Sequence, residues 1–128
     1  MNNSTVASGI MAGKRGLVMG VANERSIAWG ISEAVAAQGA ELAFTYQGDA
    51  LKKRVEPLAA AVGSSLVMPC DVTDEASMDA VFDKLKRFWG SIDFIVHAIA
   101  YSDKEELKGG YVDTTRDNFQ RTMDISVY

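Results

Sequence analysis

Residues 14–30 read Lys-Arg-Gly-Leu-Val-Met-Gly-Val-Ala-Asn-Glu-Arg-Ser-Ile-Ala-Trp-Gly. The pattern predicts a short buried strand from Gly16 to Met19, a turn that opens at Gly20, and a helix that begins near Ser26. Backbone N–H groups at the start of a helix that follows a strand can hold an anion such as a pyrophosphate. The stretch therefore favours an α/β fold with a phosphate-binding turn.

The turn lacks the usual three-glycine dinucleotide pattern, because Ala22 fills the second glycine position and Arg25 the third. Ser26 stands instead where a helix N-cap belongs. A phosphate would there meet the Ser26 hydroxyl and amide, the Ile27 amide and the positive end of the helix dipole. Taken alone, the stretch is explained equally well by a capped helix after an ordinary loop.

The remaining chain alternates between apolar strand patterns and amphipathic helix patterns. Further strands are expected at 41–46, 66–68 and 94–96, and further helices begin near Asp49, Asp74 and Thr114 or Thr115. This order predicts a Rossmann-type doubly wound parallel sheet of the α/β class, with the first four strands and their helices present. The last helical pattern stops at Tyr128, so we expect the C-terminal half of the domain to be missing.

Four details of the helices are predicted. Ile27 and Ile31 should lie on the buried face of the first helix, and Gly30 should pack closely against the strand or turn. Asp49 should cap the second helix. Pro57 should kink or split that helix, because proline removes one intrahelical hydrogen bond.

Composition excludes several classes of protein. A net charge of −4 without any basic run argues against a nucleic-acid partner, and no apolar stretch approaches the length of a membrane helix. The single cysteine, Cys70, excludes a disulfide framework and favours a reducing compartment, so a cytoplasmic location is expected. We expect a flexible N-terminal arm over residues 1–12 and part of one dinucleotide-binding domain over residues 13–128.

Ligands of open parallel sheets lie beyond the carboxyl ends of the strands. The second strand is followed by Gln47, where a dinucleotide fold usually has an acidic residue that binds ribose. A neutral amide can still bind ribose or adenine. No arginine follows directly to bind a 2′-phosphate, which favours NADH over NADPH. Lys52 and Lys53 lie close enough in the sequence to leave NADPH as an alternative.

Asp71 and Val72 follow the third strand and His97 ends the fourth. Asp71 fits either a contact to the adenine amino group, with Val72 against the ring, or the role of a helix cap or turn residue. His97 is expected to be packed and hydrogen-bonded, and Cys70 to be a small buried apolar side chain. No spacing of side chains suggests a metal site.

The chain resembles the bacterial NADH-dependent enoyl-acyl-carrier-protein reductases, a divergent group of the short-chain dehydrogenase/reductase superfamily. The resemblance extends from Ala12 onward, and its most specific parts are the long turn with Ser26-Ile27 and the Phe44-Thr45-Tyr46-Gln47 strand end. The other matching stretches are Gly20–Ala22, Ala28–Gly30, Gly39–Ala43, Cys70–Val72, Asp93–Ile99 and Asp124–Ser126.

The resemblance implies ligand contacts for eight residues. It places Gly20, Ser26 and Ile27 at the pyrophosphate of NADH, Gln47 at the adenosine ribose, Asp71 and Val72 at the adenine, Ile99 at the nicotinamide ribose and Ser102 at the acyl substrate. It further implies a homotetramer.

The resemblance also implies the reaction, in which hydride passes from NADH to a trans-2-enoyl thioester on acyl carrier protein during fatty-acid synthesis. The tyrosine and lysine that assist it in the family are expected beyond Tyr128. No catalytic residue is therefore assigned, and the 128-residue chain alone is expected to be inactive. The alternatives are a non-catalytic dinucleotide-binding fragment, another short-chain dehydrogenase/reductase, or a methyltransferase that uses S-adenosylmethionine, against which Gln47 counts.

Overall fold

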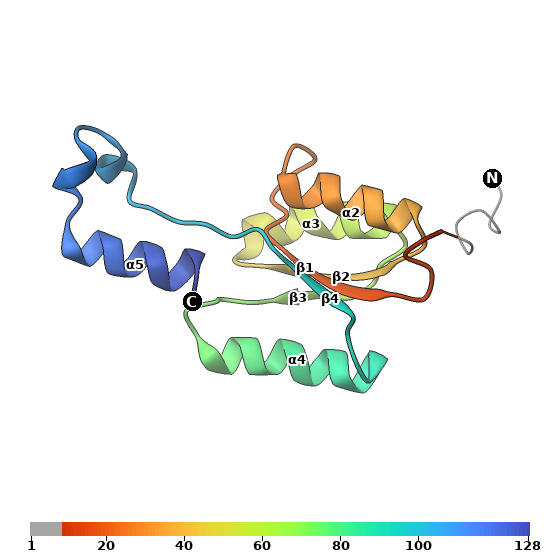
Figure 1. Cartoon of the computed structure of the whole chain (residues 1–128). Helices are drawn as coiled ribbons and strands as arrows, with labels where there is room; N and C mark the ends of the chain where they lie inside the picture. The colour runs from red at the N-terminus through yellow and green to blue at the C-terminus, as the bar shows by residue number, and fades with distance from the viewer. Residues whose placement is uncertain (1–8) are drawn as a thin grey trace. The chain divides into compact units, whose positions relative to one another are not determined.

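The structure, a computed structural model, describes residues 9–128 as two compact units, one ending at Ala98 and one covering Ile99–Tyr128 (Figure 1). Residues 1–8 of the expected N-terminal arm lie outside the described residues. The rest of that arm is attached to the first unit, since the Met11 amide donates to the Gln38 carbonyl at 2.9 Å and the Met11 side chain packs against the core.

The first unit is built on a four-stranded parallel sheet in the order β3-β2-β1-β4. The strands are β1 (Arg15–Met19), β2 (Glu41–Tyr46), β3 (Val67–Pro69) and β4 (Phe94–His97). The two central strands are almost entirely buried, as their continuous apolar runs predict for a sheet covered on both faces. The predicted parallel α/β architecture is confirmed.

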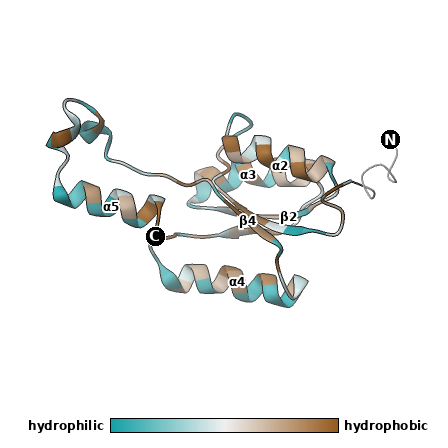
Figure 2. Ribbon diagram, viewed as in Figure 1, coloured by the Kyte–Doolittle hydropathy of each residue, from teal (hydrophilic) through white to brown (hydrophobic). Residues whose placement is uncertain are grey.

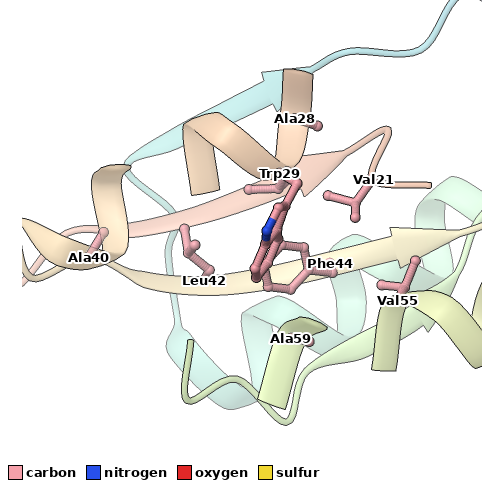
Figure 3. Packing of buried hydrophobic residues seen from close by; sticks show 9 residues of the cluster. Val21, Ala28, Trp29, Ala40, Leu42, Phe44, Val55 and Ala59 are labelled. Atoms are coloured by element: carbon pink, nitrogen blue, oxygen red, sulfur yellow. The ribbon is translucent and has the colours of Figure 1, made fainter. Parts of the chain in front are cut away.

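Helices cover both faces of this sheet. Figure 1 shows α2 (Ile27–Ala37) and α3 (Asp49–Ala61) on one face and α4 (Glu75–Trp89) on the other. The core between the sheet and the first two helices is centred on Trp29 and Phe44, whose ring centroids lie 6.3 Å apart (Figure 3). Burial of these two large rings fixes α2 on β2, and therefore the position at which α2 begins.

The buried face of α2 differs from the predicted one. Ile27 is 80% exposed, and the buried residues of the helix are Ala28, Trp29 and Ser32. The helix is thus rotated by about one residue, or 100°, because the Trp29 ring takes the place nearest the sheet. The predicted close packing of Gly30 is also wrong, since Gly30 is exposed and a Cβ there would meet nothing within 4 Å.

Two predictions for α3, a cap at Asp49 and a split at Pro57, are wrong as well. Gly48, with a φ of 86°, is the N-cap, and Asp49 is the first helical residue. The helix runs without interruption through Pro57, and Val55 and Ala59 on either side of the proline are fully buried. Packing of this face on the sheet outweighs the one hydrogen bond that proline removes, since tertiary burial supplies most helical stability.

The predicted cap of α4 is confirmed, because Asp74 Oδ1 accepts from the Ala76 amide at 3.0 Å.

In the second unit, two short 3-10 helices, η1 (Lys104–Leu107) and η2 (Tyr111–Asp113), precede α5 (Arg116–Ser126). Thr115 caps α5, as one of the two predicted threonines. Figure 2 shows hydrophobic and hydrophilic segments alternating along α5, and two of its apolar side chains, Phe119 and Met123, are exposed. No helix within residues 9–128 combines the length and apolarity needed to cross a bilayer.

Candidate functional site

The turn after β1 begins at Gly20, whose backbone φ is 117°. A Cβ at this position would lie 2.2 Å from the Ala98 carbonyl oxygen and 2.6 Å from its carbon, which are backbone atoms that follow β4. Only glycine combines the left-handed conformation with this close approach of two chains. The glycine therefore lets the chain leave β1 sharply at the carboxyl edge of the sheet.

Ser26 occupies the N-cap position of α2, as predicted, but its hydroxyl does not cap the helix. Ser26 Oγ accepts from the Ala22 amide at 2.9 Å and from the Asn23 amide at 3.0 Å, and it makes no capping bond to the helix. Asn23 Oδ1 in turn accepts from the Arg25 amide at 2.8 Å. The seven-residue turn is thus held by its own side chains rather than by glycines.

Three hydrogen-bond donors at this turn have no acceptor among residues 9–128. A hydroxyl has two acceptor sites and one donor, so the Ser26 O–H is free after both acceptor sites are used. It has no acceptor among residues 9–128, and neither do the Ile27 and Ala28 amides at the start of α2. Unpaired donors at the positive end of a helix dipole are of the kind that suits an anion, so the pyrophosphate contact stays a prediction.

Gln47 follows β2 directly and is exposed. Its side chain has no hydrogen-bond partner among the residues that the structure describes. The strand register places Met19 beside Thr45, so β1 and β2 end at the same edge of the sheet. The amide is therefore free to bind a ligand at the edge that carries the β1–α2 turn.

Asp71 lies after β3 and forms a turn with Thr73. Asp71 Oδ1 accepts from the Thr73 amide at 2.9 Å and from the Thr73 hydroxyl at 2.7 Å, and these two bonds lower the pKa of the Asp71 carboxyl below its ordinary value. Asp71 is therefore ionised at neutral pH, and its turn role is confirmed, whereas its contact with adenine stays a prediction. Val72 beside it is half-buried.

Cys70 is buried, as predicted, and burial raises the pKa of its thiol. His97 is exposed and its side chain makes no hydrogen bond within residues 9–128, so the prediction that it is packed and bonded is wrong. No group of three or more potential metal-ligating His, Cys, Asp or Glu side chains occurs in the same described range.

Ile99 and Ser102 belong to the second unit. Ile99 is half-buried. Ser102 lines a cleft of about 690 Å³ whose walls are largely apolar, and its hydroxyl accepts from Asn118 Nδ2 at 3.2 Å. The apolar residues of this cleft are Leu107, Tyr111, Val112, Phe119 and Met123.

Two asparagines at these sites were not predicted. Asn23 fixes the β1–α2 turn, and the buried Asn118 also accepts from the Asp103 amide at 2.9 Å, which fixes the loop that carries Ser102. A polar residue in the first turn of an amphipathic helix gives no signal of its own, because it is equally suited to solvent. Six predicted residues, Gly20, Ser26, Ile27, Gln47, Asp71 and Val72, lie along the carboxyl edge of one sheet.

Comparison with known proteins gives consistent results. The family model described as enoyl-(acyl carrier protein) reductase matches residues 20–128. An NADH enoyl-[acyl-carrier-protein] reductase of Rhizobium meliloti is 68% identical over 122 residues, which are 95% of this chain and 45% of the relative. The chain thus spans just under half the length of the curated relatives that it matches.

Two solved structures extend the comparison. The Anaplasma phagocytophilum reductase in complex with NAD superimposes with a TM-score of 0.88 at 55% identity, over 92% of this chain and 45% of that one. The Bacillus cereus enoyl-acyl carrier protein reductase with NADP⁺ and an indole naphthyridinone superimposes with a TM-score of 0.87 at 44% identity. This match covers 91% of the present chain and 46% of the Bacillus cereus chain.

Proposed function

Because the chain belongs to the enoyl-(acyl carrier protein) reductase family, we propose that it carries the cofactor-binding part of an NADH-dependent reductase of enoyl thioesters on acyl carrier protein, acting in fatty-acid synthesis. The observation that carries the proposal is the β1–α2 turn. Its Ser26 hydroxyl proton and the Ile27 and Ala28 amides have no acceptor among residues 9–128 and belong to three successive residues at the start of a helix. A pyrophosphate supplies the acceptors that these donors lack.

The adenosine half of the cofactor is assigned to the next two strand ends. Gln47 binds the ribose hydroxyls, for which its exposed amide offers both donors and an acceptor. Asp71 accepts from the adenine amino group through the carboxylate oxygen that its turn does not use, and Val72 packs on the ring. Ionisation of Asp71, favoured by its lowered pKa, suits it to accept this hydrogen bond.

The reacting groups are assigned to the second unit. Ile99 contacts the nicotinamide ribose, and Ser102 lies at the acyl group, in agreement with the apolar lining of its cleft. NADH supplies the hydride that adds to C3 of the enoyl group. This moves the π electrons onto the thioester oxygen as an enolate, which then takes a proton at C2. No tyrosine of residues 9–128 is assigned as the proton donor.

We further propose a homotetramer in the cytoplasm. Val127, which directly follows α5, is an exposed apolar residue that does not line the Ser102 cleft, and it is suited to contact with another copy. The single cysteine, without a disulfide, agrees with a reducing compartment.

The Gln47→Arg variant tests the adenosine site. A guanidinium at the end of β2 would meet a 2′-phosphate in bidentate fashion, so we expect the ratio of NADPH affinity to NADH affinity to rise about tenfold, the effect of a charged hydrogen bond. The measurement is titration of both dinucleotides by nicotinamide fluorescence. S-adenosylmethionine serves as a competitor that should displace neither. An unchanged ratio would show that Gln47 does not face the ribose, and displacement by S-adenosylmethionine would favour a methyltransferase.

A further inference from the structure

The last residue of α5, Ser126, holds both backbone polar groups of Tyr101. Its hydroxyl oxygen accepts from the Tyr101 amide at 3.0 Å, and its hydroxyl donates to the Tyr101 carbonyl at 3.3 Å. We call these two hydrogen bonds the Ser126 clamp. The two residues belong to the second unit and lie 25 positions apart in the sequence, so the clamp is a tertiary contact. It satisfies the backbone of a residue that belongs to no helix or strand.

A second residue of α5 holds the same loop. The buried Asn118 accepts from the Asp103 amide at 2.9 Å and donates to the Ser102 hydroxyl at 3.2 Å. Asn118 precedes Ser126 by two helical turns, so both side chains lie along one side of α5. Three successive loop residues, 101–103, are therefore fixed to the helix by hydrogen bonds.

The two residues before Tyr101 have no such support. Ile99 and Ala100 belong to no helix or strand, and their backbone groups make no hydrogen bond with any of residues 9–128. A segment of this kind takes its conformation from its fixed neighbours, and a ligand that binds it loses affinity to the entropy of ordering it. The Ser126 clamp fixes the residue that directly follows Ala100, so it reduces that entropy loss.

We infer that Ser126 is a positioning residue for the nicotinamide half of the cofactor. Through the Tyr101 backbone it holds Ile99 and Ala100 in the conformation that binds the nicotinamide ribose. The inference rests on the proposed function, which assigns Ile99 to this ribose. Ser126 itself has no assigned contact with the cofactor. Its loss should therefore weaken binding of the nicotinamide half and spare the adenosine half, which is assigned to residues of the first unit.

The test titrates NADH and ADP into the full 128-residue chain by isothermal titration calorimetry, because ADP has the adenosine and pyrophosphate groups but no nicotinamide. In Ser126→Ala we expect NADH affinity to fall about fivefold, the scale of one neutral hydrogen bond, with ADP affinity within about twofold of wild type. Ser126→Thr keeps the hydroxyl and should bind both nucleotides within about twofold of wild type. A general loss of structure would instead lower both affinities together.

The matched control is Thr122→Val. Thr122 lies one turn before Ser126 on the same side of α5, and its buried hydroxyl oxygen has no partner among residues 9–128. Valine has nearly the same shape, so this variant removes a hydroxyl that holds nothing and should keep both affinities within about twofold. Equal losses of NADH affinity in Thr122→Val and Ser126→Ala would mean that the packing of α5 sets the affinity, and would overturn the inference.

Hydrogen exchange of the Tyr101 amide, followed by NMR, checks the Ser126 clamp without any ligand. Ser126→Ala should speed this exchange about fivefold or more, and Thr122→Val should leave it unchanged. Unchanged exchange in Ser126→Ala, or an unchanged ratio of NADH affinity to ADP affinity, would overturn the inference and leave the proposed function standing. A wild-type chain that does not bind NADH would overturn the proposed function and the inference with it.

Discussion

The Gly20→Ala variant is expected to lose about 3 kcal/mol of unfolding free energy, the sum of a left-handed backbone penalty and a steric clash. The φ of 117° disfavours any residue with a Cβ, and that Cβ would lie 2.2 Å from the Ala98 carbonyl oxygen. Because backbone atoms on both sides would have to move, β1 and β4 must separate where they end. Dinucleotide binding should be lost with the turn.

Gly63→Ala is the control for this variant. Gly63 also has a positive φ, 78°, but a Cβ there would meet nothing within 4 Å. The Gly63→Ala variant should therefore lose only the backbone conformational part of the unfolding free energy, about 1 kcal/mol. Urea unfolding followed by circular dichroism measures both variants. Equal losses would mean that the contact with Ala98 contributes nothing and that the tight exit from β1 has been misinterpreted.

The Ser26→Ala variant is expected to weaken NADH binding by at least tenfold, the scale of one hydrogen bond to a charged group. The change removes the free O–H donor and also the acceptor that holds the Ala22 and Asn23 amides at 2.9 and 3.0 Å. Loss of the two turn bonds should lower the unfolding free energy by about 1–2 kcal/mol as well.

Ser65→Ala provides the comparison for Ser26→Ala, because Ser65 is exposed and lies before β3, away from the carboxyl ends of the strands. Isothermal titration calorimetry should give the Ser65→Ala variant an NADH affinity within about twofold of that of the wild type. If Ser26→Ala binds NADH as tightly as Ser65→Ala does, the serine-led turn does not hold the cofactor.

The fold could be predicted from the sequence because local signals and tertiary packing agree along most of the chain. Aliphatic runs mark the central strands, and Asp74 caps α4 as its position before an apolar period indicates. Where packing competes with a local rule, prediction failed. Burial of the Trp29 ring sets the orientation of α2, so Ile27 is exposed to solvent. Burial of Val55 and Ala59 stabilises α3 as one helix despite Pro57.

The site was predictable only as a set of positions. A serine before a helix favours both an N-cap and a turn, and residue type alone cannot show that the Ser26 hydroxyl would bind the amides of Ala22 and Asn23 instead of the helix.

We propose above all that the turn after β1 and the first residues of α2 hold the pyrophosphate of a dinucleotide. The most direct measurement is a titration of the ¹⁵N-labelled chain with NADH, followed through the backbone amide signals in two-dimensional NMR. We predict saturable shifts that are largest at Ile27 and Ala28, whose amides have no acceptor among residues 9–128. Saturation with those two signals unmoved, or no saturation at all, would contradict the account.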